Sequence, residues 1–92
     1  MRNHFYPVFL DLRRRLCVVI GGGDIGERKI AHLLEAGATV RVVAPEVTPA
    51  VARWAQEGRV AWEAREYRPG DLRGAWLVVA ATDAREVNER IA

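Results

Sequence analysis

Three closely spaced glycines, set between an apolar run and an amphipathic stretch, constrain this chain more than any other feature. Gly21, Gly23 and Gly26 follow directly on residues 16–20 and have the spacing G-x-G-x-x-G. In a strand–turn–helix setting such glycines allow a tight turn, a close approach of the backbone to a pyrophosphate, and packing of helix on strand. The helix start also offers free N–H groups to an anion. The motif therefore predicts a dinucleotide site; the alternative is a glycine-rich turn that binds nothing.

Four further segments have the apolar, β-branched composition of strands or of the chain that leads into them. The expected strands are residues 16–20, 39–43, 60–64 and 75–81, with an extended lead-in at 7–12. Residues 75–81 are nearly all apolar and predict a strand buried on both faces. Residues 65–74 form a polar connection with a turn at Pro69-Gly70.

Helix signals alternate with these strands. Residues 25–36 have an apolar face and end at Gly37. A second helix is capped by Thr48, has Pro49 at its first position and closes at Gly58. A last helix follows the fourth strand and is capped by Thr82 or Asp83.

Strands that alternate with helices indicate a parallel sheet with right-handed crossovers. We expect an α/β fold, a Rossmann-type parallel sheet with strand order 3-2-1-4 that is truncated before the next strand. Residues 1–92 would then be one NAD-binding domain and a fragment of a longer chain. A ligand at the switch point, between the first and fourth strands, would touch the turns after Ile20 and Ala81.

The candidate cofactor-binding residues lie in three turns at the ends of predicted strands. They are Gly21, Gly22, Gly23, Asp24, Ile25, Gly26, Ala44, Pro45, Glu46, Thr82 and Asp83. Asp24 either caps the first helix or contacts the cofactor through its backbone, and the sequence is compatible with both roles. Asp83 is either an N-cap or a group that faces the ribose or nicotinamide. Arg28 and Lys29 lie early in the helix, where they face an anion or simply solvent.

The segment after the second strand decides between NAD and NADP. An acidic residue near this point binds the ribose hydroxyls in NAD sites, whereas an arginine accommodates the 2′-phosphate of NADP. Glu46 lies 20 residues beyond Gly26, and no arginine follows the strand directly. The expected cofactor is therefore NAD, with residues 44–46 against its adenosine half.

Composition restricts the chain to a few classes. Ninety-two residues with 50% hydrophobic and 28% charged residues are ordinary for one small globular domain. No apolar run reaches the ~20 residues of a membrane span, and the N-terminus lacks a signal-peptide pattern, so the cytoplasm is expected. Cys17 is the one cysteine and is expected to be a buried, inert thiol. No metal site is expected. The arginine run at 13–15 predicts a solvated turn, and Trp54, Trp62 and Trp76 predict core or sheet packing.

The residues resemble a known family, the N-terminal NAD-binding domain of siroheme synthase and the stand-alone precorrin-2 dehydrogenases. The triple glycine, Arg-Lys in the following helix and Ala-Ala-Thr-Asp together are more specific than a general dinucleotide motif. The matching segments are Pro7–Leu12, Val19–Lys29, Leu33–Ala38 with Val43–Pro45, and Ala80–Asp83 with Val87–Arg90.

The resemblance implies oxidation of precorrin-2, an anionic tetrapyrrole, to sirohydrochlorin with NAD as hydride acceptor. In many members it also implies ferrochelatase activity, and it implies a homodimer built largely by residues beyond this chain. The family's strongest catalytic candidate, an aspartate on the next strand, would follow Ala92, so the catalytic residues are unknown here.

Two other classes remain possible from the residues. One is a regulatory module that senses NAD without catalysis, because the same strand–glycine–helix unit serves both. The other is an interaction or nucleic-acid module with a purely structural glycine turn, whose binding would depend steeply on salt. The arginines do not cluster into a stripe, and neither nucleic acid nor membrane is expected as a partner.

Overall fold

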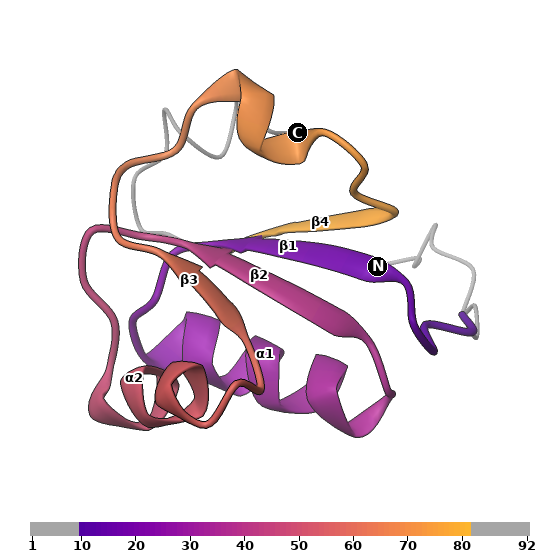
Figure 1. The fold of residues 1–92 in the computed structure, drawn as a ribbon, viewed down its shortest axis with the longest axis horizontal. Helices are drawn as coiled ribbons and strands as arrows, with labels where there is room; N and C mark the ends of the chain where they lie inside the picture. Colours follow the sequence, from indigo (N-terminus) through magenta and orange to yellow (C-terminus); the bar gives the residue numbers. More distant parts are fainter. Residues whose placement is uncertain (1–9, 82–92) are drawn as a thin grey trace, which may run out of the picture.

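The computed structural model describes residues 10–81, which form a four-stranded parallel sheet flanked by helices (Figure 1). The strands are β1 (Leu16–Ile20), β2 (Thr39–Val43), β3 (Ala61–Glu63) and β4 (Leu77–Ala80). The helices are α1 (Asp24–Glu35), α2 (Pro49–Gln56) and the short 3-10 helix η1 (Pro69–Leu72). The strand order β3-β2-β1-β4 confirms the expected α/β class and 3-2-1-4 topology.

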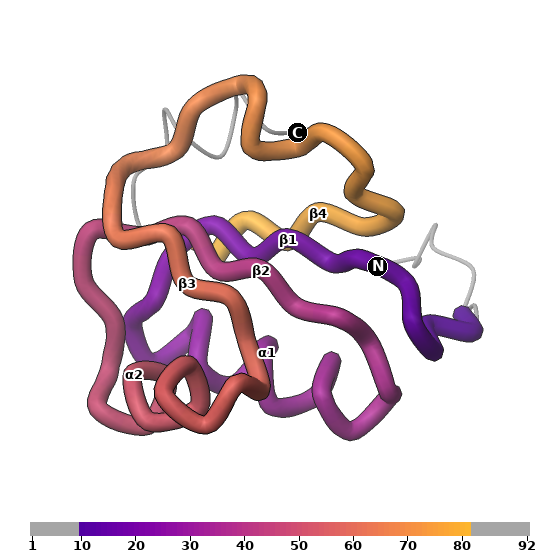
Figure 2. The backbone as a smooth tube through the Cα atoms, in the orientation of Figure 1, coloured from indigo at the N-terminus to yellow at the C-terminus, as the bar shows by residue number. Residues whose placement is uncertain are grey.

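The central strand is β1, which pairs in parallel with β2 on one side and β4 on the other (Figure 2). Residues 17–20 are all at most 3% exposed. Cys17 and Val19 belong to the core on the helical face, whereas Val18 and Ile20 belong to the core on the opposite face. A strand covered on both faces requires a continuous apolar sequence, which explains the unbroken run of apolar residues here.

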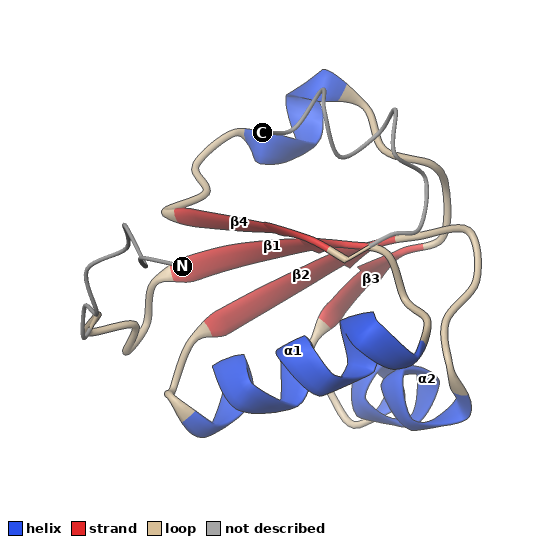
Figure 3. Ribbon diagram, turned by 180° about the vertical axis from the view of Figure 1, so that it is seen from behind, coloured by secondary structure: helices blue, strands red, loops and turns tan. Residues whose placement is uncertain are grey.

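Both α-helices cover the same face of the sheet (Figure 3). Ile30 and Leu33 of α1 and Val51 of α2 are buried against Val19 and Val42 of the sheet. The apolar side chains recur at helical spacing, so each helix buries one stripe and exposes its charged side.

The helix ends follow from local sequence. Gly37, at φ 82°, donates its N–H to Leu34 O, and Ala38 donates to Leu33 O, which together form a Schellman motif at the end of α1. At the start of α2, the Thr48 hydroxyl accepts a hydrogen bond from the N–H of residue 51 at 3.3 Å. The expected glycine stop and threonine cap are both confirmed.

The connection from β3 to β4 covers the opposite face of the sheet and includes η1 (Figure 1). Tyr67, Leu72 and Ala75 from this connection pack against Val18 and Ile20 of β1. Polar contacts add to this apolar packing.

Asp71 supplies those contacts, and it is only 7% exposed. Its carboxylate forms a two-pronged ion pair with the Arg65 guanidinium, one hydrogen bond of which measures 2.8 Å, and accepts a bond of 2.6 Å from the Arg68 N–H. The Arg65 guanidinium, helped by the Arg68 amide, lowers the pKa of Asp71 to about 2. The buried carboxylate is therefore ionised, and in this form it holds the connection between β3 and β4 in place.

Several local expectations are wrong in detail. Both β3 and β4 are shorter than 60–64 and 75–81. The turn expected at Pro69-Gly70 is present, since the Asp71 N–H donates to Arg68 O at 2.9 Å across it, and it forms part of η1. The side chains of β4 are half-buried rather than buried on both faces, because within residues 10–81 the strand has a neighbour on one side. Residues 10–12, the described part of the expected lead-in, are neither helix nor strand, so their extended course stays a prediction.

The tryptophans divide into two groups. Trp54 and Trp62 pack half-buried against the core, as expected. Trp76 is 45% exposed, with the Arg15 guanidinium 4.6 Å from its ring centroid, so the expectation of core packing is wrong there. The neighbouring residues 13 and 14 form the expected solvated turn, with Arg14 at φ 63°.

Some expectations fall outside the described residues. These are the last helix, its cap at Thr82 or Asp83, and the first part of the lead-in. Within residues 10–81 no helix has both the length and the apolar character that crossing a membrane would demand.

Replacement of the buried carboxylate should expose its contribution to stability. Asp71→Asn should lower the free energy of unfolding by about 2 kcal/mol at pH 7, since the carboxyl pKa is about 2 in the fold and near 3.8 when unfolded. A lowered pKa stabilises the fold above the unfolded value, so the difference between variant and parent should shrink as the pH falls from about 4 to about 2.

Urea unfolding at a series of pH values measures this difference. Asp11→Asn is the matched control, because Asp11 pairs with Arg13 at 2.9 Å but is well exposed, and its loss should change little. Equal effects of the two substitutions would contradict the assigned role of Asp71.

Candidate functional site

The carboxyl ends of β1, β2 and β4 meet at one edge of the sheet, where the glycine turn begins. Gly21 has φ 113°, a conformation that favours glycine, and its N–H donates to Val43 O at 3.0 Å. Across the other side of β1, the Ala81 N–H donates to Ile20 O at 2.8 Å. The turn is therefore anchored to both neighbouring strands before the chain enters α1.

Two glycines are required by close backbone packing. A Cβ at Gly26 would lie 2.4 Å from Gly21 O, because the first turn of α1 rests directly on the turn. A Cβ at Gly22 would lie 2.4 Å from Val47 Cγ1 and 2.7 Å from Glu46 O. The packing role expected for Gly26 is confirmed, and Gly22 has a similar role toward the segment after β2.

Gly23 differs because it faces open space. A Cβ there would meet no heavy atom of the described residues within 4 Å. Gly23 is the N-cap of α1, and no side-chain hydrogen bond caps the helix in the part of the chain that the structure describes. The free N–H groups of the first turn are consequently available to an anion.

Asp24 is not the helix cap, contrary to one of its two expected roles. The extended cap position, with φ −79° and ψ −160°, belongs to Gly23, and Asp24 is the first helical residue with an exposed side chain. A carboxylate in the first turn still interacts favourably with the helix dipole. Ile25, Arg28 and Lys29 are also exposed.

The segment after β2 forms the second wall of the site. Ala44 is 3% exposed, its N–H donates to Glu63 O at 3.1 Å, and its carbonyl accepts the Trp62 indole N–H at 2.9 Å. Pro45 and Glu46 follow and are exposed. The loop thus has a fixed base and a tip that faces solvent.

A backbone hydrogen bond joins the two walls. The Thr48 N–H donates to Gly22 O at 2.9 Å, in addition to the cap that its hydroxyl provides for α2. The glycine turn and the loop after β2 therefore hold one another in place.

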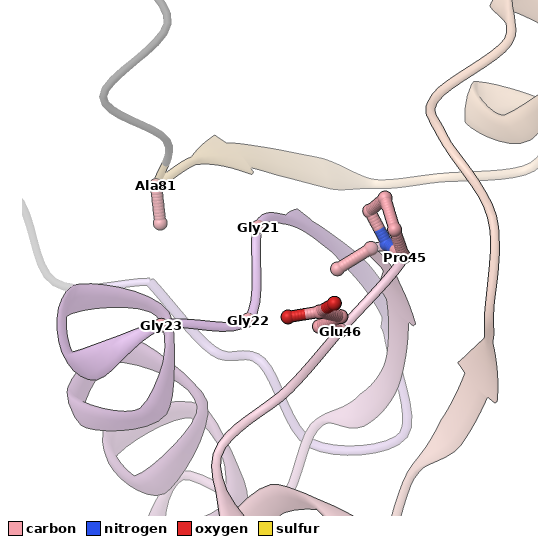
Figure 4. Close-up of a pocket in the computed structure, with 7 residues that line it drawn as sticks. Gly21, Gly22, Gly23, Pro45, Glu46 and Ala81 are labelled. Atoms are coloured by element: carbon pink, nitrogen blue, oxygen red, sulfur yellow. The ribbon is translucent and has the colours of Figure 1, made fainter.

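Between the walls lies a cleft of about 360 Å³ (Figure 4). Figure 4 shows the Glu46 side chain directed toward the glycine turn, with Ala81 on the far side of that turn. The cleft is lined by Gly21, Gly22, Gly23, Ala44, Pro45, Glu46 and Ala81.

Six of the eleven residues expected at the site line this cleft. Asp24, Ile25 and Gly26 lie on the adjoining first turn of α1, and Thr82 and Asp83 lie outside the described residues. Ala81 was not among the candidates, although its place directly after β4 at the switch point could have indicated it.

The chemistry of the cleft fits a dinucleotide phosphate. Backbone N–H groups and a helix start provide donors without a charged side chain, and the exposed Glu46 carboxylate can accept hydrogen bonds from hydroxyls. Residues 10–81 contain no group of three or more histidine, cysteine or acidic side chains that could hold a metal ion.

Fold and cleft together define a Rossmann-type dinucleotide-binding domain. Residues 8–92 match the model of a family described as "Putative NAD(P)-binding", and the chain belongs to this family. Membership confirms that the expected cofactor is a nicotinamide dinucleotide.

Individual relatives agree with this assignment. Siroheme synthase 3 of Aeromonas hydrophila is 49% identical over 84 residues, which cover 91% of this chain and 18% of that protein. The siroheme synthase of Methylobacillus flagellatus is 48% identical over 85 residues, with 92% and 18% covered. A solved structure named "SirC, precorrin-2 dehydrogenase" has a TM-score of 0.87 and 35% identity, with 92% of this chain and 43% of that chain covered. These matches confirm the resemblance, and the chain spans less than a fifth of the curated relatives' length.

The different surroundings of Gly22 and Gly23 predict different effects of substitution. Gly23→Val should leave the fold stable, because its Cβ enters open space, but should weaken NAD binding at least tenfold by filling the pyrophosphate position. Gly22→Ala should instead destabilise the protein by about 1–3 kcal/mol, since its Cβ overlaps backbone atoms.

Calorimetric titration with NAD and urea unfolding separate the two effects. Undiminished NAD affinity in a folded Gly23→Val protein would show that the glycine turn does not bind the cofactor.

Proposed function

We propose that this chain is the NAD-binding part of an enzyme that oxidises precorrin-2 to sirohydrochlorin with NAD as hydride acceptor, as a step of siroheme synthesis. The observation that carries the proposal is the glycine-walled cleft, in a chain 49% identical to a siroheme synthase and similar in fold to a precorrin-2 dehydrogenase. Ferrochelatase activity is included for the full-length protein, because the curated relatives are named siroheme synthases.

In this proposal the described residues bind and orient the cofactor. The pyrophosphate lies on the N–H groups at Gly22 and Gly23, where no side chain obstructs it. The adenosine half lies along residues 44–46, and the nicotinamide half lies toward Ala81, with Thr82 and Asp83 next in sequence. A bound nicotinamide supplies the hydride acceptor, and the walls contribute orientation and exclusion of water.

The tetrapyrrole substrate, the homodimer and the cytoplasmic location belong to the same proposal. Precorrin-2 carries many carboxylates, which suits a protein whose basic residues are almost all arginine. Support for the dimer comes from the resemblance to siroheme synthases.

Glu46 should make the site prefer NAD to NADP. Its carboxylate faces the cleft near the expected ribose position and would repel a 2′-phosphate, so NAD should bind about tenfold more tightly. Glu46→Gln should reduce this preference to about threefold or less, mainly through stronger NADP binding.

Affinities for both dinucleotides should be measured at one ionic strength, because salt screens the repulsion between the Glu46 carboxylate and the 2′-phosphate. Glu63→Gln is the matched control: Glu63 is exposed at the end of β3 and is absent from the cleft lining among the described residues. Tighter binding of NADP than NAD by the parent chain would show that Glu46 faces elsewhere.

Turnover tests the proposed reaction itself. We expect residues 1–92 to bind NAD without oxidising precorrin-2, and a version that continues through the family's next strand and dimer segment to form NADH. A general base of the kind expected in that strand contributes about 10²–10⁴-fold. The assay follows NADH formation anaerobically with precorrin-2. NAD binding without any turnover in the longer version would instead favour a regulatory NAD-sensing module.

A further inference from the structure

The carbonyl of Ala44 stands at the point where the pairing of β2 with β3 stops. In a parallel ladder that continued past Glu63, this carbonyl would accept the N–H of residue 65. That N–H instead donates to Glu63 O at 2.9 Å, in a tight turn that carries the chain away from β2. The end of the ladder thus leaves a buried carbonyl without its regular backbone partner.

Trp62 replaces the missing partner. Its indole N–H donates to Ala44 O at 2.9 Å, and its half-buried ring packs against the core that includes Val42 and Val51. Packing against the core restricts the ring, so its N–H fixes the carbonyl in one direction. The next two residues in the chain, Pro45 and Glu46, line the cleft.

We propose that Trp62 is a positioning residue for the adenosine half of the cofactor, acting through the Ala44 carbonyl on residues 44–46. The inference rests on the proposed function, since it assigns the adenosine half to this wall. It separates the two halves of the site: the indole supports the adenosine wall, whereas the nicotinamide side near Ala81 is anchored by Ile20 O.

Trp62→Phe removes the indole donor and keeps an aromatic ring in the core. Trp54→Phe is the matched control, because Trp54 is also half-buried against the same core and donates no indole hydrogen bond within the described residues. Calorimetry with ADP, NMN and NAD measures the two halves separately. Trp62→Phe should weaken ADP and NAD about three- to tenfold, the loss expected for one hydrogen bond, and leave NMN within twofold. Trp54→Phe should change none of the three beyond twofold.

A measurement on the parent protein keeps the inference testable if Trp62→Phe does not fold. The indole N–H resonance of Trp62 should shift on addition of ADP and remain in place on addition of NMN. Equal ADP affinity in a folded Trp62→Phe protein, equal losses for ADP and NMN, or an indole resonance that ignores ADP would each overturn the inference and leave NAD binding intact. Failure of the parent to bind NAD would overturn the proposed function as well, and the two failures are thereby distinguished.

Discussion

The contact on which the site depends is between the backbone of α1 and the end of β1. A Cβ at Gly26 would come within 2.4 Å of Gly21 O, so the helix rests on the turn without any intervening side chain. This seating places the start of α1 beside the cleft, where Gly23 is part of the lining and no side chain among residues 10–81 caps the helix. The donors for an anion are therefore a result of how the helix packs, and no charged residue is needed to create them.

A second constraint ties this turn to the loop after β2. The Thr48 N–H bonds to Gly22 O, and a Cβ at Gly22 would overlap Glu46 O, so the two walls touch through backbone atoms. Backbone contacts vary little with side-chain rotamer, and they keep the width of the cleft fixed before any ligand arrives. A preformed site loses less conformational entropy on binding than one that must be ordered.

The sequence predicted the order of strands, the helix ends and most of the cleft because these depend on local signals. The glycine spacing, Gly37 and Thr48 each act within a few residues of themselves. Hydrogen bonds between residues further apart left no such signal. The Asp71 carboxylate is bound by Arg65 across a turn, and the Ala44 carbonyl is bound by the Trp62 indole eighteen residues away. The cap role considered for Asp24 was wrong for a similar reason, since which residue takes the extended cap conformation depends on how the turn packs.

The buried thiol of β1 gives the sheet an internal reporter of its own opening. Cys17 is the one cysteine of the chain, is fully buried in the central strand, and burial raises the pKa of its thiol. The thiolate is the reactive form of cysteine, and burial disfavours it. A thiol reagent therefore modifies Cys17 at an appreciable rate only after β1 separates from the layers that cover it. The labelling rate consequently measures how often the sheet opens. A ligand that binds the closed cleft slows this labelling in proportion to its occupancy. The labelling rate of a core residue therefore reports on ligand binding at the edge of the sheet.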